Sequence, residues 1–371
     1  MTTDDRLERR IRHLIETAGP IPVSDYMATC LFDPELGYYT TREPFGASGD
    51  FITAPEISQM FGEIVGAWLI HAWRMMGRPT PFALVEIGPG RGTLMRDILR
   101  TARLDPAFAE AAQPWLVEVS PRLRDIQRDT LAEATPRCEW SDDVSGLPNL
   151  PMLIVANELF DAVPFRQIVK SADAWRERMV SVADDGKLAF VAGATSVVGD
   201  ILPPGAAEQP DGAVFEFAPA REALASRIAA RLTETTGAAL FLDYGHAEPG
   251  FGDTFQALRG HAPAGVFDTP GQCDLTSHVD FSALTFAATA AGASAKPVIT
   301  QGEFLLSLGL AERAGALGAN ADAARRDEIR VAAGRLAGAG ENQMGSLFKV
   351  LCIAGQALDL PPFARRPDQR G

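Results

Sequence analysis

Apolar residues recur at two different spacings along the chain, and the spacing predicts where helices and strands lie. At the N-terminus a helical spacing from Leu7 to Ile15 predicts a first helix that stops before a Gly-Pro pair. A second helical stripe covers residues 57–69 and predicts one continuous helix. Thr53 and Glu56 stand just before this stripe with the spacing of a capping box, which predicts that they begin the helix.

From residue 82 onward, short unbroken apolar runs alternate with helical spacing. The runs that indicate buried strands are 82–85, 115–117, 152–156 and 238–242. Unbroken apolar strands separated by helices are typical of a parallel sheet that is covered on both faces. Ligands of such sheets bind outside the carboxyl ends of the strands. An acidic residue stands at or next to the end of every one of these runs: Glu86, Glu118, Glu158 and Asp243.

Two segments interrupt the alternation and suggest insertions. Residues 165–183 predict a hairpin, and residues 245–300 have little regular period. Residues 311–340, rich in alanine and arginine, predict helix, and residues 347–351 predict a last strand. We therefore expect three regions along the chain. They are an N-terminal helical region that contributes to the active-site cleft (1–80), a core with insertions at about 165–215 and 245–340 (81–353), and a C-terminal tail (354–371).

Composition and charge exclude several classes of protein. Of 371 residues, 46% are hydrophobic and 22% charged, which is typical of a globular protein and not of a disordered one. The net charge of −14 argues against binding along a nucleic-acid backbone. Four cysteines without paired spacing suggest neither a metal site nor a disulfide framework. No apolar run is long enough to span a membrane, and the acidic N-terminus is unlike a signal peptide, so we expect a cytoplasmic protein.

The strongest local signal is the segment from Glu86 to Thr93, in which Gly88, Gly90 and Gly92 alternate with other residues. Glycines let the backbone pass close to a ligand, and the helix that follows offers free N–H groups. The spacing is Gly-x-Gly-x-Gly, unlike the Gly-x-Gly-x-x-Gly of dinucleotide-binding proteins. Glu86 would repel a pyrophosphate and attract a cation, which favours S-adenosyl-L-methionine over NAD. The alternative is a tight strand-to-helix turn without a ligand.

Two further acids extend this predicted cofactor site. Glu118, at the end of the next strand, is placed to accept hydrogen bonds from both hydroxyls of a ribose, unless it is only a solvated strand end. Asp142 follows a short strand at 137–140 and could accept a hydrogen bond from the adenine amino group. Asp143 is an equal candidate on its chemistry alone.

The segment after the fourth run contains candidate catalytic residues. Asn157, Glu158 and Asp161 follow the strand 152–156, and a helical turn there would place both carboxylates on one face. A pair of carboxylates can hold a planar guanidinium and favour its deprotonation. The alternative is a cluster of acids that stabilises the start of a helix.

Other polar residues are ambiguous. Gly49 and Asp50 precede the capped helix and could either close over a cofactor or only turn the chain. His246, His261 and His278 could assist a substrate pocket, although a single histidine is more often a hydrogen-bonded structural residue.

Taken together, these segments resemble the MidA family of class I S-adenosylmethionine-dependent methyltransferases. Mitochondrial members of that family are complex I assembly factors that methylate a protein arginine. The matching segments, in chain order, are Ser48–Gly62, Glu86–Gly92, Asn157–Ala162, Asp243–Gly245, Asp274–Phe281 and Met344–Leu351.

The resemblance implies a fold, a cofactor and an activity. The fold would be an α/β, Rossmann-like, seven-stranded class I methyltransferase sheet with an N-terminal helical region and insertions at the substrate cleft. Glu86, the three glycines and Glu118 would form the S-adenosyl-L-methionine site, and Gly49 and Asp50 would border it. The activity would be symmetric dimethylation of an arginine in a complex I subunit.

The chain lacks the targeting presequence of the mitochondrial members, so it resembles a bacterial member, whose substrate could be the bacterial equivalent. Three other interpretations stay open. One is a methyltransferase for a small amine or carboxylate, and another is a non-catalytic assembly chaperone that binds the cofactor. A dehydrogenase fits least, because the glycine spacing and Glu86 are wrong for a pyrophosphate.

Overall fold

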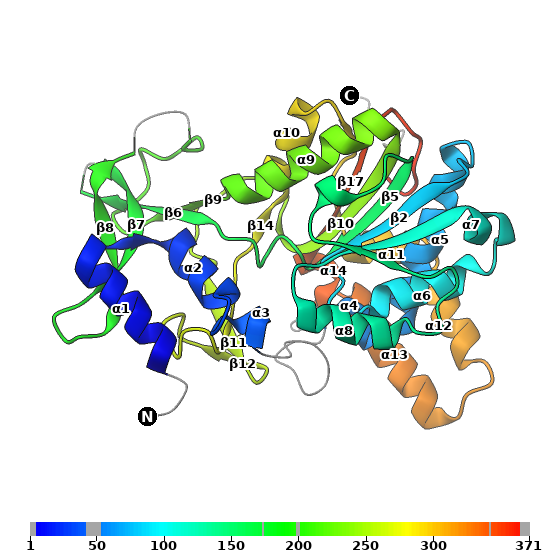
Figure 1. Cartoon of the computed structure of the whole chain (residues 1–371), viewed down its shortest axis with the longest axis horizontal. Coiled ribbons are helices and arrows are strands. Elements are labelled where there is room, and N and C mark those ends of the chain that lie inside the picture. Colours follow the sequence, from blue (N-terminus) through cyan, green and yellow to red (C-terminus); the bar gives the residue numbers. More distant parts are fainter. Residues whose placement is uncertain (1–4, 42–52, 173, 198–200, 341–342, 364–371) are drawn as a thin grey trace. The chain divides into compact units, whose positions relative to one another are not determined.

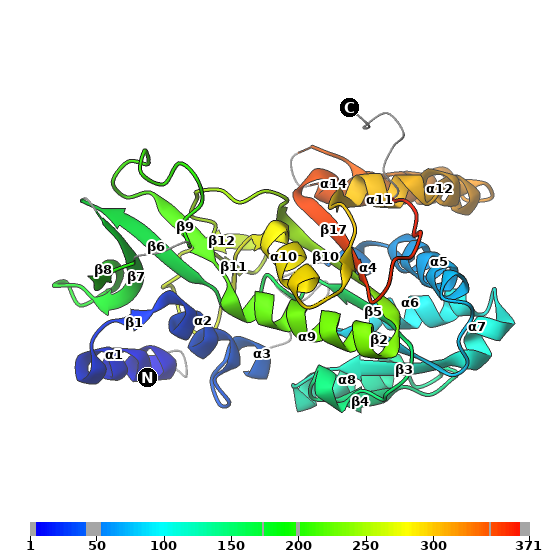
Figure 2. The same cartoon turned by 90° about the horizontal axis from the view of Figure 1, so that it is seen from above.

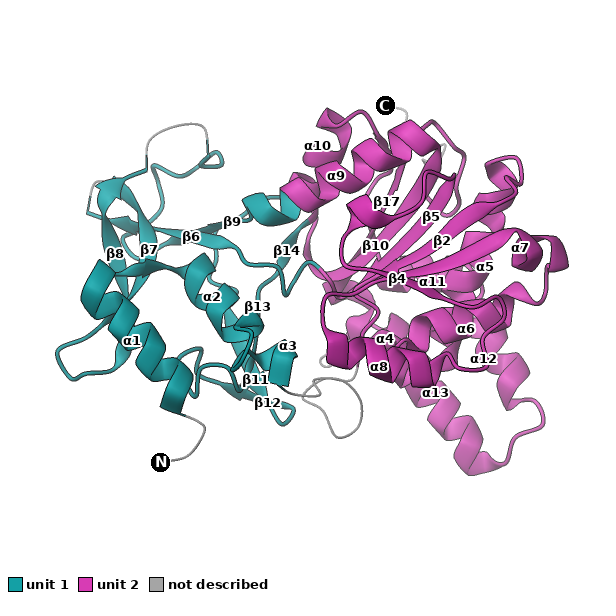
Figure 3. Cartoon of the chain, in the orientation of Figure 1, with its two compact units in different colours: residues 1–51, 160–222, 248–280 teal, residues 52–159, 223–247, 281–371 magenta. Residues whose placement is uncertain are grey.

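The chain forms two compact units, each assembled from three segments of the sequence (Figure 3). Unit 1 comprises residues 1–51, 160–222 and 248–280, and unit 2 comprises residues 52–159, 223–247 and 281–371. The computed structural model describes residues 5–41, 53–172, 174–197, 201–340 and 343–363. The chain therefore leaves and re-enters each unit more than once.

Unit 2 is built on a mixed sheet with the strand order β15-β17-β10-β5-β2-β3-β4 (Figure 1). The strands are β2 (Phe82–Ile87), β3 (Ala112–Val117), β4 (Glu139–Ser141), β5 (Met152–Asn157), β10 (Gly237–His246), β15 (Ser294–Ala295), β16 (Ile299–Thr300) and β17 (Phe348–Ala354). Neighbours from β10 to β4 are parallel, and β17 runs antiparallel to β10. The predicted parallel strands and the last strand are confirmed. The predicted count of seven is not confirmed, because the outer edge of β17 pairs with two separate two-residue strands, β15 and β16.

Helices cover both faces of this sheet (Figure 2). The helices are α4 (Ala54–Ile57), α5 (Gln59–Met75), α6 (Thr93–Ala102), α7 (Pro106–Ala111), α8 (Pro121–Thr130), α9 (Pro219–Thr235), α10 (Phe281–Ala290), α11 (Gln301–Ser307), α12 (Leu310–Gly318), α13 (Ala323–Ala337) and α14 (Met344–Leu347). Leu84 of β2 packs into a core with α5, α6 and α11. Its neighbours Ala83 and Val85 point to the opposite face and are equally buried. Burial on both faces explains why these strands are uninterrupted apolar runs.

The start of the second predicted helix differs from expectation. The chain forms a short helix α4, breaks at Ser58, and begins α5 with the Ser58 hydroxyl accepting from the Met60 backbone N–H. The Thr53 side chain makes no capping hydrogen bond, so the predicted capping box is wrong. Glu56 instead accepts a hydrogen bond from Thr93 Oγ1 at 2.5 Å, so a tertiary contact replaces the local one.

Unit 1 contains helices and two small antiparallel sheets. The helices are α1 (Arg6–Ala18), α2 (Val23–Phe32) and α3 (Tyr38–Thr41). The strands are β1 (Ile21–Pro22), β6 (Arg166–Ser171), β7 (Ala174–Val182), β8 (Leu188–Ser196), β9 (Val214–Phe217), β11 (Gln256–Arg259), β12 (Ala262–Ala264), β13 (Asp274–Thr276) and β14 (Val279–Asp280). One sheet has the order β1-β7-β6-β9, with β8 on the other edge of β7, and the second has the order β12-β11-β13. Pairing of β6 with β7 confirms the predicted hairpin, and α1 confirms the first predicted helix.

Candidate functional site

The carboxyl ends of the parallel strands bring acidic and amide side chains to one edge of the unit 2 sheet. Strands β10, β5, β2, β3 and β4 lie side by side in that order. Figure 1 labels β10, β5 and β2, and Figure 2 also labels β3 and β4. The side chains at this edge are Asp243, Asn157, Glu86, Glu118 and Asp142. Because the strands are parallel, residues far apart in the sequence meet there, as expected of a ligand-binding edge.

The glycine loop between β2 and α6 needs glycine for its backbone. Gly88, Gly90 and Gly92 have φ values of 66°, 52° and 81°, in the left-handed region that other residues enter only with strain. A Cβ on Gly88 would lie 2.9 Å from Leu159 Cδ1, and one on Gly92 would lie 3.4 Å from Leu131 Cδ1. Gly92 is also the N-cap of α6, so the loop delivers the backbone to the N-terminus of a ten-residue helix. The loop has the shape of a cradle for a ligand, with a helix N-terminus beside it.

Glu86 is buried beneath this loop, where only 3% of its surface is exposed. Burial raises the pKa of its carboxyl from 4.5 to about 8, and a hydrogen bond from the Met95 backbone N–H only partly opposes this. Glu86 Oε2 has no hydrogen-bond partner among the described residues. A carboxyl in this state gains from a nearby cation, because a positive charge would favour its ionised form.

Glu118 follows β3 and is held on both oxygens. Oε1 accepts from the Ser120 N–H at 2.8 Å, and Oε2 accepts from Gln127 Nε2 at 3.2 Å. Burial raises the pKa of Glu118, and these hydrogen bonds counteract the shift. A carboxylate has about four acceptor positions, so capacity for two further donors is left. The site therefore has an oriented acceptor of the kind that ribose hydroxyls require.

Asp142 is placed differently from Glu118. Its side chain is 82% exposed and forms an ion pair with Arg124, which also donates to the Glu118 carbonyl oxygen. Asp143, the alternative candidate, caps the following turn by accepting from the Ser145 N–H at 2.8 Å. Arg124 thus connects the ends of β3 and β4. Its ion pair with Asp142 distinguishes this acid from Asp143, and the sequence alone does not.

Asn157 ends β5, and the next residue, Glu158, has an unusual backbone conformation. Glu158 has a φ of 52°, which is uncommon for a residue with a side chain and costs about 1–2 kcal/mol. Glu158 Oε1 accepts from the Ala54 N–H and from Asn157 Nδ2, both at 3.0 Å. Asn157 Oδ1 is buried and has no hydrogen-bond partner among the described residues. Backbone strain and an oriented carboxylate together are typical of functional sites.

The predicted helical turn at this position is wrong. Residues 158–161 form bends and the start of a turn, not a helix, so helical spacing does not place Glu158 and Asp161 on one face. The alternative of an acidic helix start fails for the same reason. Asp161 belongs to unit 1, is 6% exposed, and its carbonyl oxygen accepts from Arg221 Nη2 at 3.1 Å. Arg221 also donates to Ser277 Oγ at 2.6 Å, so a buried arginine fixes the backbone around Asp161.

The other candidates are distributed over both units. Gly49 and Asp50 lie outside the described residues. His246 ends β10 in unit 2, whereas His261 and His278 belong to unit 1. The His278 backbone N–H donates to Thr254 Oγ1 at 2.9 Å.

Sequence reasoning missed two residues of this edge, Thr93 and Gln127. Thr93 donates to Glu56, and Gln127 donates to Gly90 and Glu118. A signal for Gln127 existed, because it stands four residues from both Leu123 and Leu131 and therefore interrupts an apolar stripe with a polar side chain. Such a side chain is buried only with hydrogen-bond partners.

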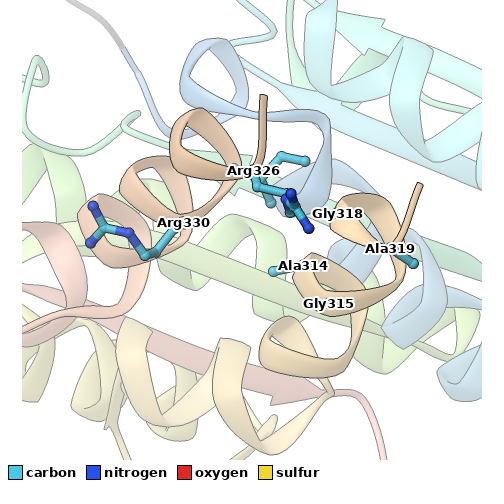
Figure 4. Close-up of a pocket in the computed structure, with 7 residues that line it drawn as sticks. Ala314, Gly315, Gly318, Ala319, Arg326 and Arg330 are labelled. Atoms are coloured by element: carbon cyan, nitrogen blue, oxygen red, sulfur yellow. The ribbon is translucent and has the colours of Figure 1, made fainter. Parts of the chain in front are cut away.

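A separate pocket of about 430 Å³ lies between α12 and α13 (Figure 4). It is lined by Ala314, Gly315, Gly318, Ala319, Arg326, Ile329 and Arg330. None of the predicted site residues lines it, so it is not the site at the strand ends.

In the part of the chain that the structure describes, no helix has the length and apolar composition needed to cross a membrane.

Comparisons with known proteins identify relatives of this chain. A family model described as an S-adenosyl-L-methionine-dependent methyltransferase matches residues 64–299. The "Protein arginine methyltransferase NDUFAF7, mitochondrial" of Xenopus tropicalis is 34% identical, with 98% of this chain and 90% of that protein covered. The Drosophila melanogaster homologue of that protein is 36% identical over 74% of this chain and 68% of its own length. A crystal structure from Burkholderia thailandensis, bound to S-adenosyl-homocysteine, has 30% identity and a TM-score of 0.82 over 98% of this chain and 96% of that chain.

Proposed function

The chain belongs to this family of S-adenosyl-L-methionine-dependent methyltransferases, and from that premise we propose that it methylates arginine side chains of a protein substrate. The proposal for the acceptor is supported by relatives named protein arginine methyltransferases at 34% to 37% identity. The observation that carries it is the strained Glu158, whose carboxylate is oriented by Ala54 and Asn157 at the end of β5. A fixed carboxylate is the group that a guanidinium acceptor requires.

The residues at the strand ends fit the cofactor. S-adenosyl-L-methionine supplies a methyl group that is activated by the positive charge on its sulfonium sulfur. Glu118 accepts hydrogen bonds from the ribose hydroxyls, and the loop from Gly88 to Gly92 brings backbone N–H groups close to the cofactor. A bound cation would favour ionisation of the buried Glu86 carboxyl, whose pKa burial raises to about 8. Asp142 is the proposed acceptor for the adenine amino group, and Gly49 and Asp50 are the proposed border of the site.

The proposed orientation and deprotonation of the acceptor guanidinium depend on the Glu158 carboxylate. Glu158 orients the guanidinium, and Asn157 holds the Glu158 carboxylate in place. The guanidinium nitrogen that gains a methyl group must lose a proton, and Glu158 accepts it. Because an arginine has a pKa above about 12, this proton leaves only as the new bond forms. Positioning of two bound reactants supplies most of the acceleration, up to about 7–11 kcal/mol.

We further propose that the substrate is a respiratory complex I subunit or its bacterial equivalent, methylated symmetrically in the cytoplasm. The resemblance to the MidA family supports this choice of partner.

The test is methyl transfer from S-adenosyl-L-methionine that carries a labelled methyl group. Purified protein is incubated with a protein extract and, separately, with the small-molecule fraction of the same cells, and labelled products are identified after hydrolysis. We expect labelled methylarginine in the protein extract. Label only in the small-molecule fraction would mean that the acceptor is a small molecule and not a protein arginine. No label in either fraction would support a non-catalytic chaperone.

Glu158→Gln is the informative variant for the catalytic assignment. It should lower the transfer rate by at least about 100-fold, as expected of a lost general base, while calorimetry shows cofactor affinity within about threefold of the original. Glu110→Gln, an exposed carboxylate on α7, is the matched control and should change neither quantity. Full activity of Glu158→Gln would exclude Glu158 from proton transfer.

A further inference from the structure

Gln127 is a fully buried polar side chain on α8, with 0% of its surface exposed. It takes a position in the apolar face of the helix, between Leu123 and the buried Leu131 that follows the helix. Burying an amide costs free energy unless its donors and its acceptor are satisfied. The hydrogen-bond partners of Gln127 therefore indicate the role of this side chain.

The orientation of the Gln127 amide is determined by Trp140. Trp140 Nε1 lies 2.9 Å from Gln127 Oε1, and an indole N–H can only donate. The amide oxygen must therefore face Trp140 on β4, and the NH₂ group must face the opposite way. Arg128, one residue after Gln127, covers the Trp140 ring at 5.3 Å from its centroid and helps to hold the indole.

Both amide protons of Gln127 reach the predicted cofactor site. Nε2 donates to the Gly90 carbonyl oxygen at 2.8 Å and to Glu118 Oε2 at 3.2 Å. A Cβ on Gly92 would lie 3.6 Å from Gln127 Cγ, so the side chain also packs against the end of the glycine loop. One amide thus connects the loop after β2 with the carboxylate after β3.

We propose that Gln127 is a positioning residue of the cofactor site, which fixes the Glu118 carboxylate relative to the glycine loop so that it accepts both ribose hydroxyls. The inference rests on the proposed role of Glu118 and goes beyond it. Gln127 does not touch the cofactor, and it acts through Glu118 and Gly90. The part of its contribution that passes through Glu118 should therefore appear only with ligands that carry ribose hydroxyls.

The experiment compares binding of adenosine and 2′,3′-dideoxyadenosine to the full-length protein by calorimetry. The unmodified protein should prefer adenosine by about tenfold or more, since its hydroxyls bond to a charged acceptor. Gln127→Met, which keeps the length and removes both donors, should reduce this preference to less than about threefold. Gln127→Glu, which sets a carboxylate against Glu118, should reduce it at least as far. Gln113→Met, the same change at an exposed position of β3, is the matched control and should keep the preference.

A second pair of variants tests the same inference if the Gln127 variants do not fold. Trp140→Phe removes the N–H that orients the amide and should lower the preference for adenosine. Trp115→Phe on β3 removes a buried indole N–H that has no hydrogen-bond partner among the described residues, so it should not lower it.

Loss of affinity for both nucleosides by the same factor in Gln127→Met would overturn the inference, because a purely structural role predicts that result. An unchanged preference would overturn it as well. Equal binding of the two nucleosides by the unmodified protein would remove the role of Glu118, and the inference with it. None of these results depends on methyl transfer, so the proposed activity stands or fails by its own assay.

Discussion

At the scale of single residues, protonation of the buried Glu86 should make the free energy of unfolding depend on pH in the physiological range. The side chain is buried, and burial raises the pKa of its carboxyl to about 8. In the unfolded chain the same carboxyl has its ordinary value of 4.5. The folded protein therefore binds a proton that the unfolded chain releases between these two pH values. Stability from this group is complete below pH 4.5 and is lost as the pH rises toward about 8.

Glu86→Gln should remove this pH dependence, because an amide does not ionise. Between about pH 5 and 8, the free energy of unfolding of the original protein should fall relative to the variant by up to about 1.4 kcal/mol per pH unit. Urea unfolding at a series of pH values measures the difference. Glu139→Gln, an exposed change on β4, corrects for the loss of one charge. Parallel curves for Glu86→Gln and the original protein would mean that Glu86 is ionised in the folded state.

At the scale of elements, the turns after the strands decide where side chains of the site lie. The loop after β2 has glycines with positive φ, whereas the bend after β5 forces Glu158 into the same region. Both turns direct the chain out of the sheet within a few residues. Gly88 has a second constraint, since Leu159 of the neighbouring bend fills the space beside its Cα. The two turns are therefore packed against each other.

Gly88→Ala should destabilise the protein more than the same change at a glycine with a similar backbone in open space. Gly186 has a φ of 79°, and no atom lies within 4 Å of the position that its Cβ would take, so Gly186→Ala is the matched control. Strain alone should cost Gly186→Ala about 1 kcal/mol, and the overlap with Leu159 should add at least about 1 kcal/mol for Gly88→Ala. Urea unfolding measures both costs. Cofactor affinity should fall at least about tenfold only for Gly88→Ala, and equal effects of the two variants would show that the loop tolerates a Cβ.

At the scale of the whole molecule, each unit completes its core with segments that are distant in sequence. In unit 2, the segment after β17 returns to α5, where Trp68 Nε1 donates to the Pro361 carbonyl oxygen at 2.8 Å. Phe363 is 3% exposed, and its ring lies 6.4 Å from Trp68 and 6.0 Å from Phe304. The end of the described chain is thus part of the core of unit 2.

Phe363→Ala should lower the free energy of unfolding by about 3 kcal/mol, because it leaves a cavity beside the Trp68 and Phe304 rings. Leu347→Ala, at a side chain that is 43% exposed, should cost less than about 1 kcal/mol. Urea unfolding followed by tryptophan fluorescence compares them. Similar midpoints for the two variants would show that Phe363 adds little to the core.

The sequence by itself determined the elements whose signals are local. Apolar runs predicted β2, β5, β10 and the second half of β3, because strand segments buried on both faces have few polar positions to interrupt them. An acid at the end of every run predicted the ligand-binding edge, since parallel strands bring their carboxyl ends together. The spacing of Gly88, Gly90 and Gly92 predicted the loop, because only glycine enters the left-handed region without strain.

Only the tertiary structure decided which partner each polar side chain takes. Glu56 has the spacing of a capping residue, yet its carboxylate accepts a hydrogen bond from the Thr93 hydroxyl on α6. Glu158 and Asp161 have helical spacing, yet the chain bends between them and assigns them to different units. Gln127 meets Gly90 and Trp140 because parallel β2, β3 and β4 place their loops side by side. Hydrogen bonds depend on distances that only the folded chain sets. The spacing of apolar residues depends on burial, and buried positions can be recognised in the sequence because they are apolar.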